Sequence, residues 1–322
     1  MRAPADRPPL TAWASALTMT FRETARAKVN LTLSVLGRRA DRYHEIESLV
    51  AFAEIGDRLL LTPGHECRVT VSGPFAGDID GPNLLDRALG LLLEPDPKLQ
   101  LGSVHLEKNL PVAAGLGGGS ADAAALLRAV RRANPECAGA VPWHALAATL
   151  GADVPVCLAG TPALIWGIGD KVEPLGAAHR LPPMAIVLVN PRLPLPTAKV
   201  YQALAAGSVP ASRRPPALPA ALADLTSLVD FMRSHGNDLE RPAISLLPAI
   251  VDIKAALAAQ PQCCIAAMSG SGPTCFGIFA DDIAAAAAAA ALTRMFPRWW
   301  VVATQVLGAS LPGPTNATDV GS

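Results

Sequence analysis

The chain has 322 residues, of which 51% are hydrophobic, and this is enough apolar material for one large domain or two ordinary ones, so we expect two lobes. Lysine plus arginine and aspartate plus glutamate are equal at 27 each, which excludes a global field that would gather nucleic acid or an anionic membrane. The six cysteines form no CxxC pair and have no histidine at zinc spacing, so we expect reduced thiols and a cytoplasmic protein.

The first twenty residues are predicted to lie outside the folded protein. They hold a weak apolar patch from Trp13 to Leu17, which is too short for us to expect a secretory signal. No stretch of the chain approaches the roughly eighteen apolar residues that a bilayer span needs. Met19 stands just before the first convincing strand. We therefore expect the residues before it to be a disordered extension, or to lie upstream of the true translation start.

Strands dominate the prediction up to residue 110. Alternating polar and apolar residues, rich in β-branched types, predict a strand at 24–36, with Lys28 and Asn30 on one face. The loop GRRADRYHE follows, and the next strand, at 46–61, is expected to break near Gly56. The remaining elements of this part are a strand at 67–72, a turn region at 73–83, a helix at 84–93 and a strand at 103–107.

The segment at 110–133, LPVAAGLGGGSADAAALLRAVRRA, is rich in glycine in its first half and in alanine, leucine and arginine in its second half. Its glycine-rich half is not expected to be regular, whereas 120–133 should be helical. A helix at 143–150 is predicted to end at Gly151 in the left-handed C-cap conformation, so that Asp153 emerges from a helix end. Strands are expected at 161–168 and 184–190, and the proline-rich join at 181–183 is the approximate boundary between the lobes.

Alternating helices and strands are predicted for the rest of the chain. Residues 208–219, rich in proline, serine and arginine, indicate a mobile surface loop. The later elements are a helix at 244–258, strands at 264–268 and 274–279, an alanine-rich helix at 283–296 and a strand at 299–306. The predicted division is an extension at 1–20, an N-terminal lobe at 21–181, a C-terminal lobe at 182–308 and a disordered tail at 309–322.

Four glycines run directly into a predicted helix. Gly115, Gly117, Gly118 and Gly119 allow the backbone to approach a ligand, and the first N–H groups of the helix favour an anion. A plain flexible turn is the alternative, but the uninterrupted helix that follows favours a phosphate cradle. It is not a Walker loop, because the GK[ST] ending is missing, and Ser120 stands where a dinucleotide fingerprint has its last glycine.

Three segments resemble the GHMP kinase superfamily. PVAAGLGGGSADAAALLRA resembles its second signature, ARAKVNLTLSVLGRRADRYHEIESLV its first motif, and MSGSGPTCFGIF its third glycine-rich loop. With RADRYHEIES and LGADVPVCL, the combination is similar to the GHMP kinases of a cytidyl-diphosphate methylerythritol, over about residues 25–279. This resemblance implies an α+β fold with two lobes, the first like ribosomal protein S5 domain 2 and the second ferredoxin-like, and an active site between them.

The implied reaction transfers the γ-phosphate of ATP, with Mg²⁺ on its phosphates, to the 2-hydroxyl of that cytidyl compound. The resemblance makes Asp153 the base that takes the hydroxyl proton, although an aspartate past a helix end is more often a turn former. It makes Lys28 the electrostatic partner of Asp153, where a solvated surface lysine is the plain alternative. Both residues are therefore expected to be catalytic.

Substrate binding is expected on two further segments. Asn30 shares a strand face with Lys28, and the resemblance favours a hydrogen bond to the substrate over a solvent-facing role. Tyr43 and Tyr201 are expected to sandwich the cytosine ring while His44 reads its edge, and packing is the alternative for Tyr201. The full predicted substrate set is Asn30, Tyr43, His44, Asp153, Thr197 and Tyr201.

One residue departs from the family pattern. The family usually has glycine before the Tyr-His pair, where this chain has Arg42, and Arg42 is strained if that position requires a positive φ. This departure affects the expected position of Tyr43.

The nucleotide is expected on the glycine-rich segment. Lys108 precedes that segment and Ser120 follows its glycines, where its hydroxyl can bond a phosphate or Mg²⁺, or cap the helix. From the second lobe, Gly270, Ser271 and Gly272 are expected to brace the phosphate loop, or else to form only a tight turn. The predicted ATP-binding set is Lys108, Pro111, Val112, Ala113, Ala114, Gly115, Leu116, Gly117, Gly118, Gly119, Ser120 and Ala121.

The alternatives are another GHMP kinase of the homoserine or mevalonate type, a non-catalytic nucleotide-binding protein, and a dinucleotide-binding oxidoreductase. The last lacks the acidic residue about twenty positions after the glycines that a nicotinamide site needs. We expect ATP and a small molecule as partners, neither nucleic acid nor membrane, and a monomer or weak homodimer.

Overall fold

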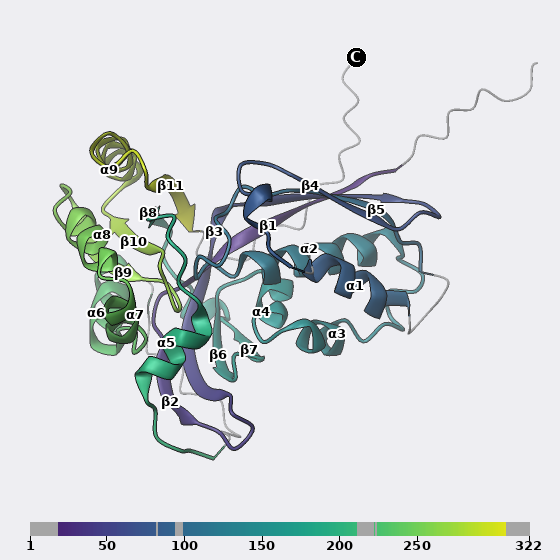
Figure 1. Cartoon of the computed structure of the whole chain (residues 1–322), viewed down its shortest axis with the longest axis horizontal. Coiled ribbons are helices and arrows are strands. Elements are labelled where there is room, and N and C mark those ends of the chain that lie inside the picture. The colour runs from purple at the N-terminus through teal and green to yellow at the C-terminus, as the bar shows by residue number, and fades with distance from the viewer. Residues whose placement is uncertain (1–18, 82, 94–98, 211–221, 223, 307–322) are drawn as a thin grey trace, which may run out of the picture.

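The structure is a computed structural model, and it describes residues 19–81, 83–93, 99–210, 222 and 224–306. Residues 1–18 of the predicted extension, the predicted tail and most of the predicted loop at 208–219 lie outside the described residues. Figure 1 shows two lobes, with the N-terminal half of the chain on the right and the C-terminal half on the left.

One long strand, β3 at His44–Pro63, organises the N-terminal lobe. It does not break near Gly56 as predicted; the irregularity is in its register with the first strand, between Arg26 and Lys28. A side chain at Gly56 would place Cβ 2.3 Å from the carbonyl oxygen of Ala25, so glycine permits the close approach at this point. A glycine that the sequence suggests as a strand end is therefore a site of tight pairing within the strand.

The other strands of this lobe are arranged around β3. The strand predicted at 24–36 is two strands, because the N–H groups of Leu31 and Thr32 both donate to the carbonyl of Leu49 and the ladder pauses there. The antiparallel partners of β3 are β1 at Phe21–Asn30, β2 at Ser34–Arg38, β5 at Gly102–Glu107 and β6 at Ala163–Gly167. The outer strands are β4 at Arg68–Ser72, parallel to β5, and β7 at Lys171–Pro174, antiparallel to β6.

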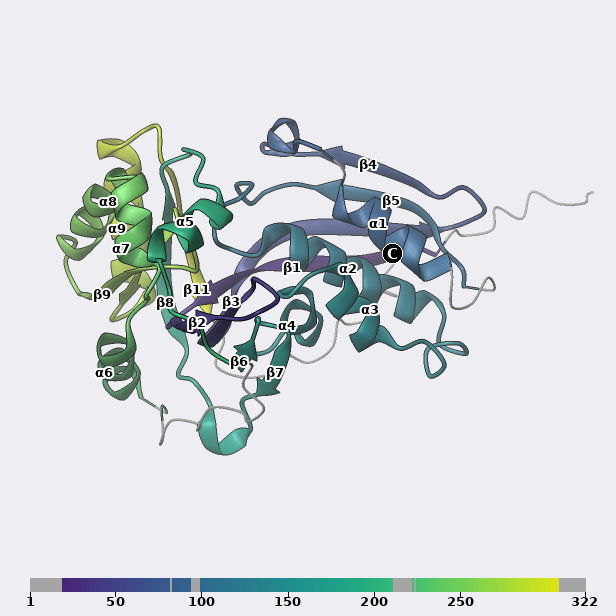
Figure 2. The ribbon, with the colours of Figure 1, turned by 60° about the horizontal axis from the view of Figure 1, so that its bottom comes forward.

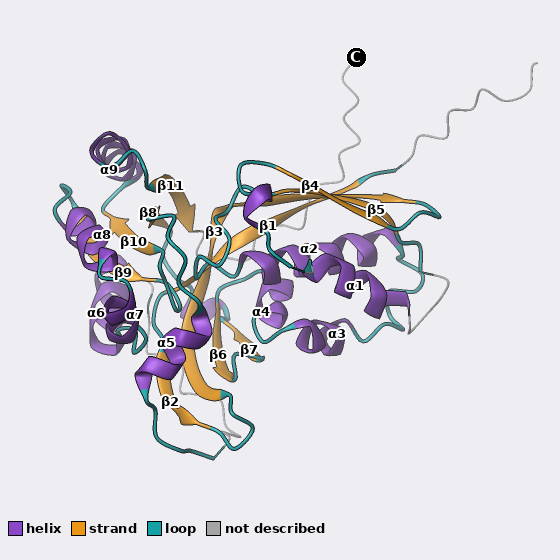
Figure 3. Cartoon of the chain, in the orientation of Figure 1, coloured by secondary structure: helices purple, strands orange, loops and turns teal. Residues whose placement is uncertain are grey.

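Helices cover one face of this sheet, as Figures 1 and 3 show. Their apolar residues, such as Leu126, Leu127 and Val130, are buried against Leu59 and Leu106 of the sheet. The four helices are α1 at Leu84–Leu93, α2 at Gly118–Ala133, α3 at Trp143–Leu150 and α4 at Val154–Ala159, of which α4 was not predicted. Burial against the sheet fixes the direction of α2, so that its N-terminus lies beside the C-terminal end of β1.

The C-terminal lobe confirms the ferredoxin-like prediction. Its strands lie antiparallel in the order β11-β8-β10-β9, and they are β8 at Met184–Asn190, β9 at Cys263–Met268, β10 at Cys275–Phe279 and β11 at Trp300–Val306. The helices are α5 at Thr197–Leu204, α6 at Leu225–His235, α7 at Glu240–Leu246, α8 at Ala249–Ala258 and α9 at Asp282–Met295. The single helix predicted at 244–258 is two, because Pro248 separates α7 from α8.

The two lobes share one continuous sheet. Val306 of β11 pairs with Ala53 of β3, which joins the strands into an eleven-stranded sheet, and the turned view in Figure 2 shows β11 beside β3. Two short 3₁₀ helices, at Ala76–Asp78 and Ala177–His179, complete the described elements. In the part of the chain that the structure describes, none of the helices combines the length and apolar character that a bilayer span requires.

Candidate active site

A cavity of about 940 Å³ lies where the two lobes meet. Its walls come from β1, the β2–β3 hairpin, the start of α2, α5 and the loop between β9 and β10. The predicted site residues that line it are Lys28, Asn30, Tyr43, His44, Ala113, Ala114, Gly115, Gly117, Gly118, Gly119, Ser120, Asp153, Thr197, Tyr201, Gly270 and Ser271. The structure thus brings together segments that are far apart in the sequence.

Lys28 and Asp153 form an ion pair inside the cavity. The Nζ of Lys28 lies 2.9 Å from Oδ2 of Asp153, and the side chains are 5% and 36% exposed. The backbone N–H of Lys28 donates a 2.9 Å hydrogen bond to the carbonyl of Leu116, which ties β1 to the glycine-rich segment. The lysine is therefore buried and fixed, while the carboxylate remains open to a ligand.

Asp153 is positioned by two helices rather than one. The predicted left-handed cap at Gly151 is wrong, because φ is 167° and ψ is 158°, which is extended backbone. Two residues later Asp153 occupies the N-cap position of α4 with helical dihedral angles, and its side chain makes no cap hydrogen bond. Its carboxylate is thus not needed to hold the helix end and stays available for the pair with Lys28.

The glycines that were predicted to cradle a phosphate form the N-terminus of α2. The helix begins at Gly118, inside the run that we expected to be irregular, and Gly117 is its N-cap with φ of 65°. The first intrahelical bond runs from the N–H of Ala121 to the carbonyl of Gly117, so the N–H groups of Gly118, Gly119 and Ser120 have no partner within the helix. Ser120 does not cap the helix, which leaves its hydroxyl on the cavity wall.

Close packing explains why two of these positions need glycine. A Cβ on Gly115, whose φ is 73°, would lie 2.5 Å from the carbonyl oxygen of Ser269. A Cβ on Gly117 would lie 3.2 Å from Cε of Lys28. The loop is thereby pressed against the C-terminal lobe on one side and the buried lysine on the other.

The loop between β9 and β10 braces the glycine-rich segment through residues that were not predicted. The hydroxyl of Ser269 donates 2.9 Å to the carbonyl of Gly115 and accepts 3.1 Å from the N–H of Asn30. The N–H of Thr274 donates 3.3 Å to the carbonyl of Ala114. Of the predicted bracing residues, Gly270 and Ser271 line the cavity, whereas Gly272 packs behind the loop.

Not every residue of the predicted ATP-binding segment faces the cavity. Pro111 and Leu116 are buried, and Leu116 belongs to the core shared with the C-terminal lobe. Val112 is partly exposed and does not line the cavity, and Ala121 lines a separate cavity of about 660 Å³ at the edge of β1. Some residues of the segment thus anchor it while others line the cavity, and the predicted ATP-binding set stays a prediction.

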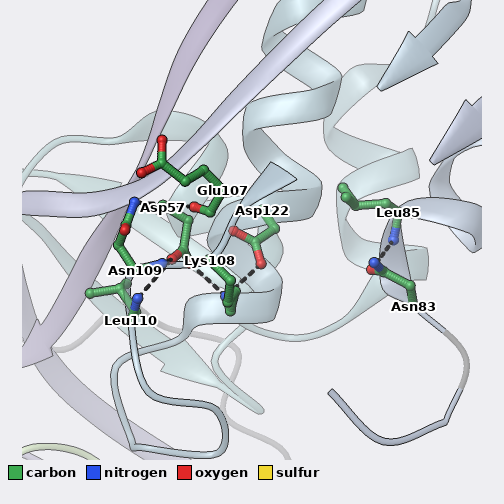
Figure 4. A network of polar contacts seen from close by, with 8 residues as sticks. All are labelled: Asp57, Asn83, Leu85, Glu107, Lys108, Asn109, Leu110 and Asp122. Carbon is green, nitrogen blue, oxygen red and sulfur yellow. Dashed lines mark hydrogen bonds and ion pairs between the residues drawn. The ribbon is translucent and has the colours of Figure 1, made fainter. Parts of the chain in front are cut away.

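Lys108 lies behind the glycine-rich segment and does not line the cavity, so its predicted place near the nucleotide stays a prediction. It is 3% exposed, and its ammonium donates to the carboxylates of Asp57 and Asp122 (Figure 4). Asp57 also accepts from the N–H groups of Asn109 and Leu110. The lysine therefore joins β3 to α2, and neither carboxylate was found from the sequence.

The two carboxylates of this network differ in their surroundings. Burial raises the pKa of Asp122 to about 7 against the opposing ammonium of Lys108, and the nearby Asp57 carboxylate adds to the rise. Its Oδ1 has no hydrogen-bond partner within the described structure. Burial by itself lowers the pKa of Lys108. The carboxylates of Asp122 and Asp57 outweigh that effect, so the pKa of Lys108 is raised overall. The three side chains thus hold one ammonium between two carboxyl groups.

The three aromatic residues of the predicted base site line one cavity. The rings of His44 and Tyr201 stack with centroids 4.7 Å apart, and Tyr43 is 58% exposed, so a cytosine ring between Tyr43 and Tyr201 stays a prediction. Burial, followed by the charge of Arg38, lowers the pKa of His44. Burial, followed by the charge of Asp153, raises the pKa of Tyr201. These shifts favour a neutral imidazole and a neutral phenol at this end of the cavity.

Side-chain hydrogen bonds hold Asn30 and Thr197, two further residues of the predicted substrate set. The amide nitrogen of Asn30 donates 2.8 Å to the hydroxyl of Ser48, and its Oδ1 has no partner within the described structure. The hydroxyls of Thr197 and Ser271 lie 2.8 Å apart. The amide oxygen of Asn30 is thus a buried acceptor without a partner at the wall of the cavity.

Arg42 has the positive φ that the family's usual glycine suggested. Its φ is 73°, a left-handed conformation that costs about 1–2 kcal/mol for a residue with a Cβ. Its side chain lines the cavity next to Tyr43.

The residues present can take part in holding a magnesium ion only to a small extent. Across the described residues there is no group of three or more histidine, cysteine, aspartate or glutamate side chains that could hold a metal ion. Mg²⁺ commonly takes most of its ligands from phosphates and water and few from protein. The hydroxyl of Ser120, on the cavity wall at the start of α2, fits that limited role.

Comparisons with known proteins agree with this geometry. Family models of the GHMP kinases N terminal domain and of the GHMP kinases C terminal match residues 83–161 and 217–298. The 4-diphosphocytidyl-2-C-methyl-D-erythritol kinases of Rhodopseudomonas palustris and Methylobacterium radiotolerans are 46% and 49% identical to the chain. Each alignment covers 88% of this chain, and they cover 96% and 97% of those proteins.

Solved structures show the same relationship. The crystal structure of a 4-(cytidine 5'-diphospho)-2C-methyl-D-erythritol kinase is 36% identical, with a TM-score of 0.68 over 89% of this chain and 100% of that one. The homoserine kinase of Cytophaga hutchinsonii is 18% identical, with a TM-score of 0.64 over 92% of this chain and 98% of that one, and shares the fold.

Proposed function

The chain belongs to the 4-diphosphocytidyl-2-C-methyl-D-erythritol kinases of the GHMP kinase superfamily, and we propose that it phosphorylates the 2-hydroxyl of that cytidyl compound with ATP. The product would be the 2-phosphate, within the non-mevalonate route to isoprenoid precursors. The observation that carries this proposal is the ion pair of Lys28 and Asp153, which opens into a cavity between a phosphate-binding helix end and an aromatic cluster.

The proposed chemistry begins with positioning. The triphosphate of ATP would lie on the N–H groups of Gly118, Gly119 and Ser120, where the dipole of α2 favours negative charge. Mg²⁺, when bound, would neutralise charge on the β- and γ-phosphates, with the hydroxyl of Ser120 as the protein group beside it. The acceptor alcohol would lie beside Asp153 and Asn30, with its cytosine at Tyr43, His44 and Tyr201.

Phosphoryl transfer then requires one proton movement. The substrate oxygen bonds to the γ-phosphorus, the bond from that phosphorus to the bridging oxygen breaks, and ADP leaves. Asp153 takes the hydroxyl proton through a carboxylate that is 36% exposed to the cavity. Lys28, held at 2.9 Å, keeps that carboxylate oriented and adds positive charge beside the transferred group.

Substrate choice tests the proposed function. A coupled assay of ADP release should detect turnover with the cytidyl compound and little with homoserine or mevalonate, because only the first has a base for the aromatic cluster. Preferential turnover of homoserine or mevalonate would reject the assignment in favour of another GHMP kinase. ATP binding without turnover of any of the three alcohols would indicate a non-catalytic protein.

Three further features belong to the proposal. We place the boundary between the lobes at 181/182, which is supported by the start of the C-terminal sheet at Met184 in β8. All six cysteines are free thiols, which supports a cytoplasmic location. A monomer or weak homodimer would suffice, because every residue assigned above comes from a single chain.

A further inference from the structure

Two arginines line the base-binding end of the cavity without acidic partners. Four lining residues are charged at neutral pH, namely Lys28, Arg38, Arg42 and Asp153, and the first and last of these neutralise each other. Within the described part of the chain, neither Arg38 nor Arg42 forms an ion pair, whereas Arg39 between them pairs with Asp41 at 2.9 Å. Two positive charges therefore face the cavity uncompensated.

The backbone holds both arginines in place. The N–H of Arg38 donates 2.6 Å to the carbonyl of Gly207, and its own carbonyl accepts 3.0 Å from the N–H of Val209. Arg42 lies across the hairpin, where its N–H donates 3.1 Å to the carbonyl of Arg39 and its φ is 73°. A residue in a left-handed conformation at a cavity wall is a form of local strain that is common at binding sites.

The position of these charges relative to the other groups limits what they can bind. Arg38 pairs with His44 in the ladder of β2 and β3, and its charge contributes to the lowered pKa of that histidine. Arg42 immediately precedes Tyr43. Both arginines thus flank the aromatic cluster on the β2–β3 hairpin, whereas the phosphate-binding N–H groups belong to the separate start of α2.

We propose that Arg38 and Arg42 bind the diphosphate that links cytidine to the acceptor alcohol, and that they set the preference for a nucleoside diphosphate substrate. The inference rests on the proposed function. The linking diphosphate carries two negative charges, which match two guanidinium groups that have no acidic partner within the described residues; Nε of Arg38 donates 3.5 Å to the carbonyl of Arg42 and so ties the two arginines together. Guanidinium groups bind phosphate oxygens through paired N–H donors more specifically than ammonium groups do.

Binding of cytidine 5'-diphosphate and of cytidine, measured by calorimetry, tests the proposal without any phosphoryl transfer. The wild type should bind the diphosphate more tightly than the nucleoside. Arg42→Gln and Arg38→Gln should each weaken diphosphate binding by about tenfold or more, and change cytidine binding by less than about twofold. Arg42→Lys should retain part of the preference because it keeps the charge.

Arg58→Gln is the matched control, because Arg58 is an exposed arginine on β3 that does not line this cavity. Thermal unfolding of each variant checks that it is folded. Equal losses for cytidine and its diphosphate would overturn the proposal, since the arginines would then act on the base or the hairpin. Unchanged diphosphate binding, or a rise confined to the KM for ATP, would overturn it as well.

The proposed function and this inference fail in different ways. A wild type that prefers the diphosphate, but transfers no phosphate to the cytidyl alcohol, would reject the proposed function and leave the diphosphate site standing. A wild type that turns over the cytidyl alcohol, with binding indifferent to both arginines, would reject only the inference.

Discussion

The hydroxyl of Ser269 donates a 2.9 Å hydrogen bond to the carbonyl of Gly115, across 154 positions of the sequence. The same hydroxyl accepts from the buried N–H of Asn30, so it joins the phosphate loop, β1 and the C-terminal lobe at one atom. We expect Ser269→Ala to lower the free energy of unfolding by about 1–3 kcal/mol, because buried polar groups lose their partner. It should also raise the KM for ATP.

Urea unfolding and initial-rate kinetics measure these two effects. The exposed Ser234, whose hydroxyl bonds only within its own helix turn, provides the control variant Ser234→Ala. A Ser269→Ala protein with wild-type stability and an unchanged KM for ATP would show that the loop does not depend on this contact.

Lys108 is expected to act on stability rather than on nucleotide contact. Replacement by methionine leaves the carboxylates of Asp57 and Asp122 buried without their ammonium, which should cost about 3–5 kcal/mol of folding free energy. The double variant Lys108→Met with Asp122→Asn should recover part of the loss above pH 7, where the buried Asp122 must otherwise ionise without an ammonium or take up a proton on folding. Denaturant midpoints of the three proteins check this, and a Lys108→Met protein as stable as the wild type would contradict it.

Asp122 should make stability depend on pH. Its pKa rises from 3.8 to about 7 on folding, mainly through burial, so between these values the folded chain keeps a proton that the unfolded chain releases. The stabilisation that it contributes is complete below pH 3.8 and is lost as the pH rises through about 7. Relative to Asp122→Asn, the wild type should therefore lose stability as the pH rises from about 4 to about 7, and the difference should become constant above that range.

Urea unfolding of the two proteins across that range gives the difference directly. A constant difference would mean that Asp122 does not change its protonation on folding.

Much of the fold could be predicted from local patterns. The helices at Leu84–Leu93 and Trp143–Leu150 and the strand at Met184–Asn190 begin and end where predicted, because apolar periodicity and flanking turn residues mark both ends. The short helices α4 and α5 were missed, since α4 is only six residues long and its sequence VPVCLA lacks a helical period. The pairing of Val306 with Ala53, which joins the lobes, has no local signal at all.

The site residues also fall into two groups, those that local motifs predict and those that only tertiary contacts reveal. Residues within the recognised motifs, such as Lys28, Asp153 and the glycines of α2, lie together in the cavity. Asp57 and Ser269 were missed, because each acts through a tertiary contact with a residue 51 or 154 positions away. The burial of Lys108 was not predicted either, since the sequence gives its proximity to the glycines but not its tertiary contacts.

Tyr201 should contribute to binding of the cytidyl compound and not of ATP. Its ring stacks on His44 at the end of the cavity away from α2, and loss of an aromatic stacking surface costs about 1–3 kcal/mol per base. Tyr201→Leu should therefore raise the KM for the cytidyl compound about tenfold or more, with the KM for ATP little changed. Tyr201→Phe is the control, because it keeps the ring, and a KM that rises equally for both substrates would point to a structural defect instead.

The central claim is that the carboxylate of Asp153, paired with the buried Lys28, takes the proton of the acceptor hydroxyl. ADP release with the cytidyl compound, measured for the wild type and for Asp153→Asn at saturating substrates, tests it most directly. We predict that kcat falls by about 10²–10⁴-fold in Asp153→Asn, while the KM values and the melting temperature change little. A variant that keeps the wild-type kcat would contradict the account.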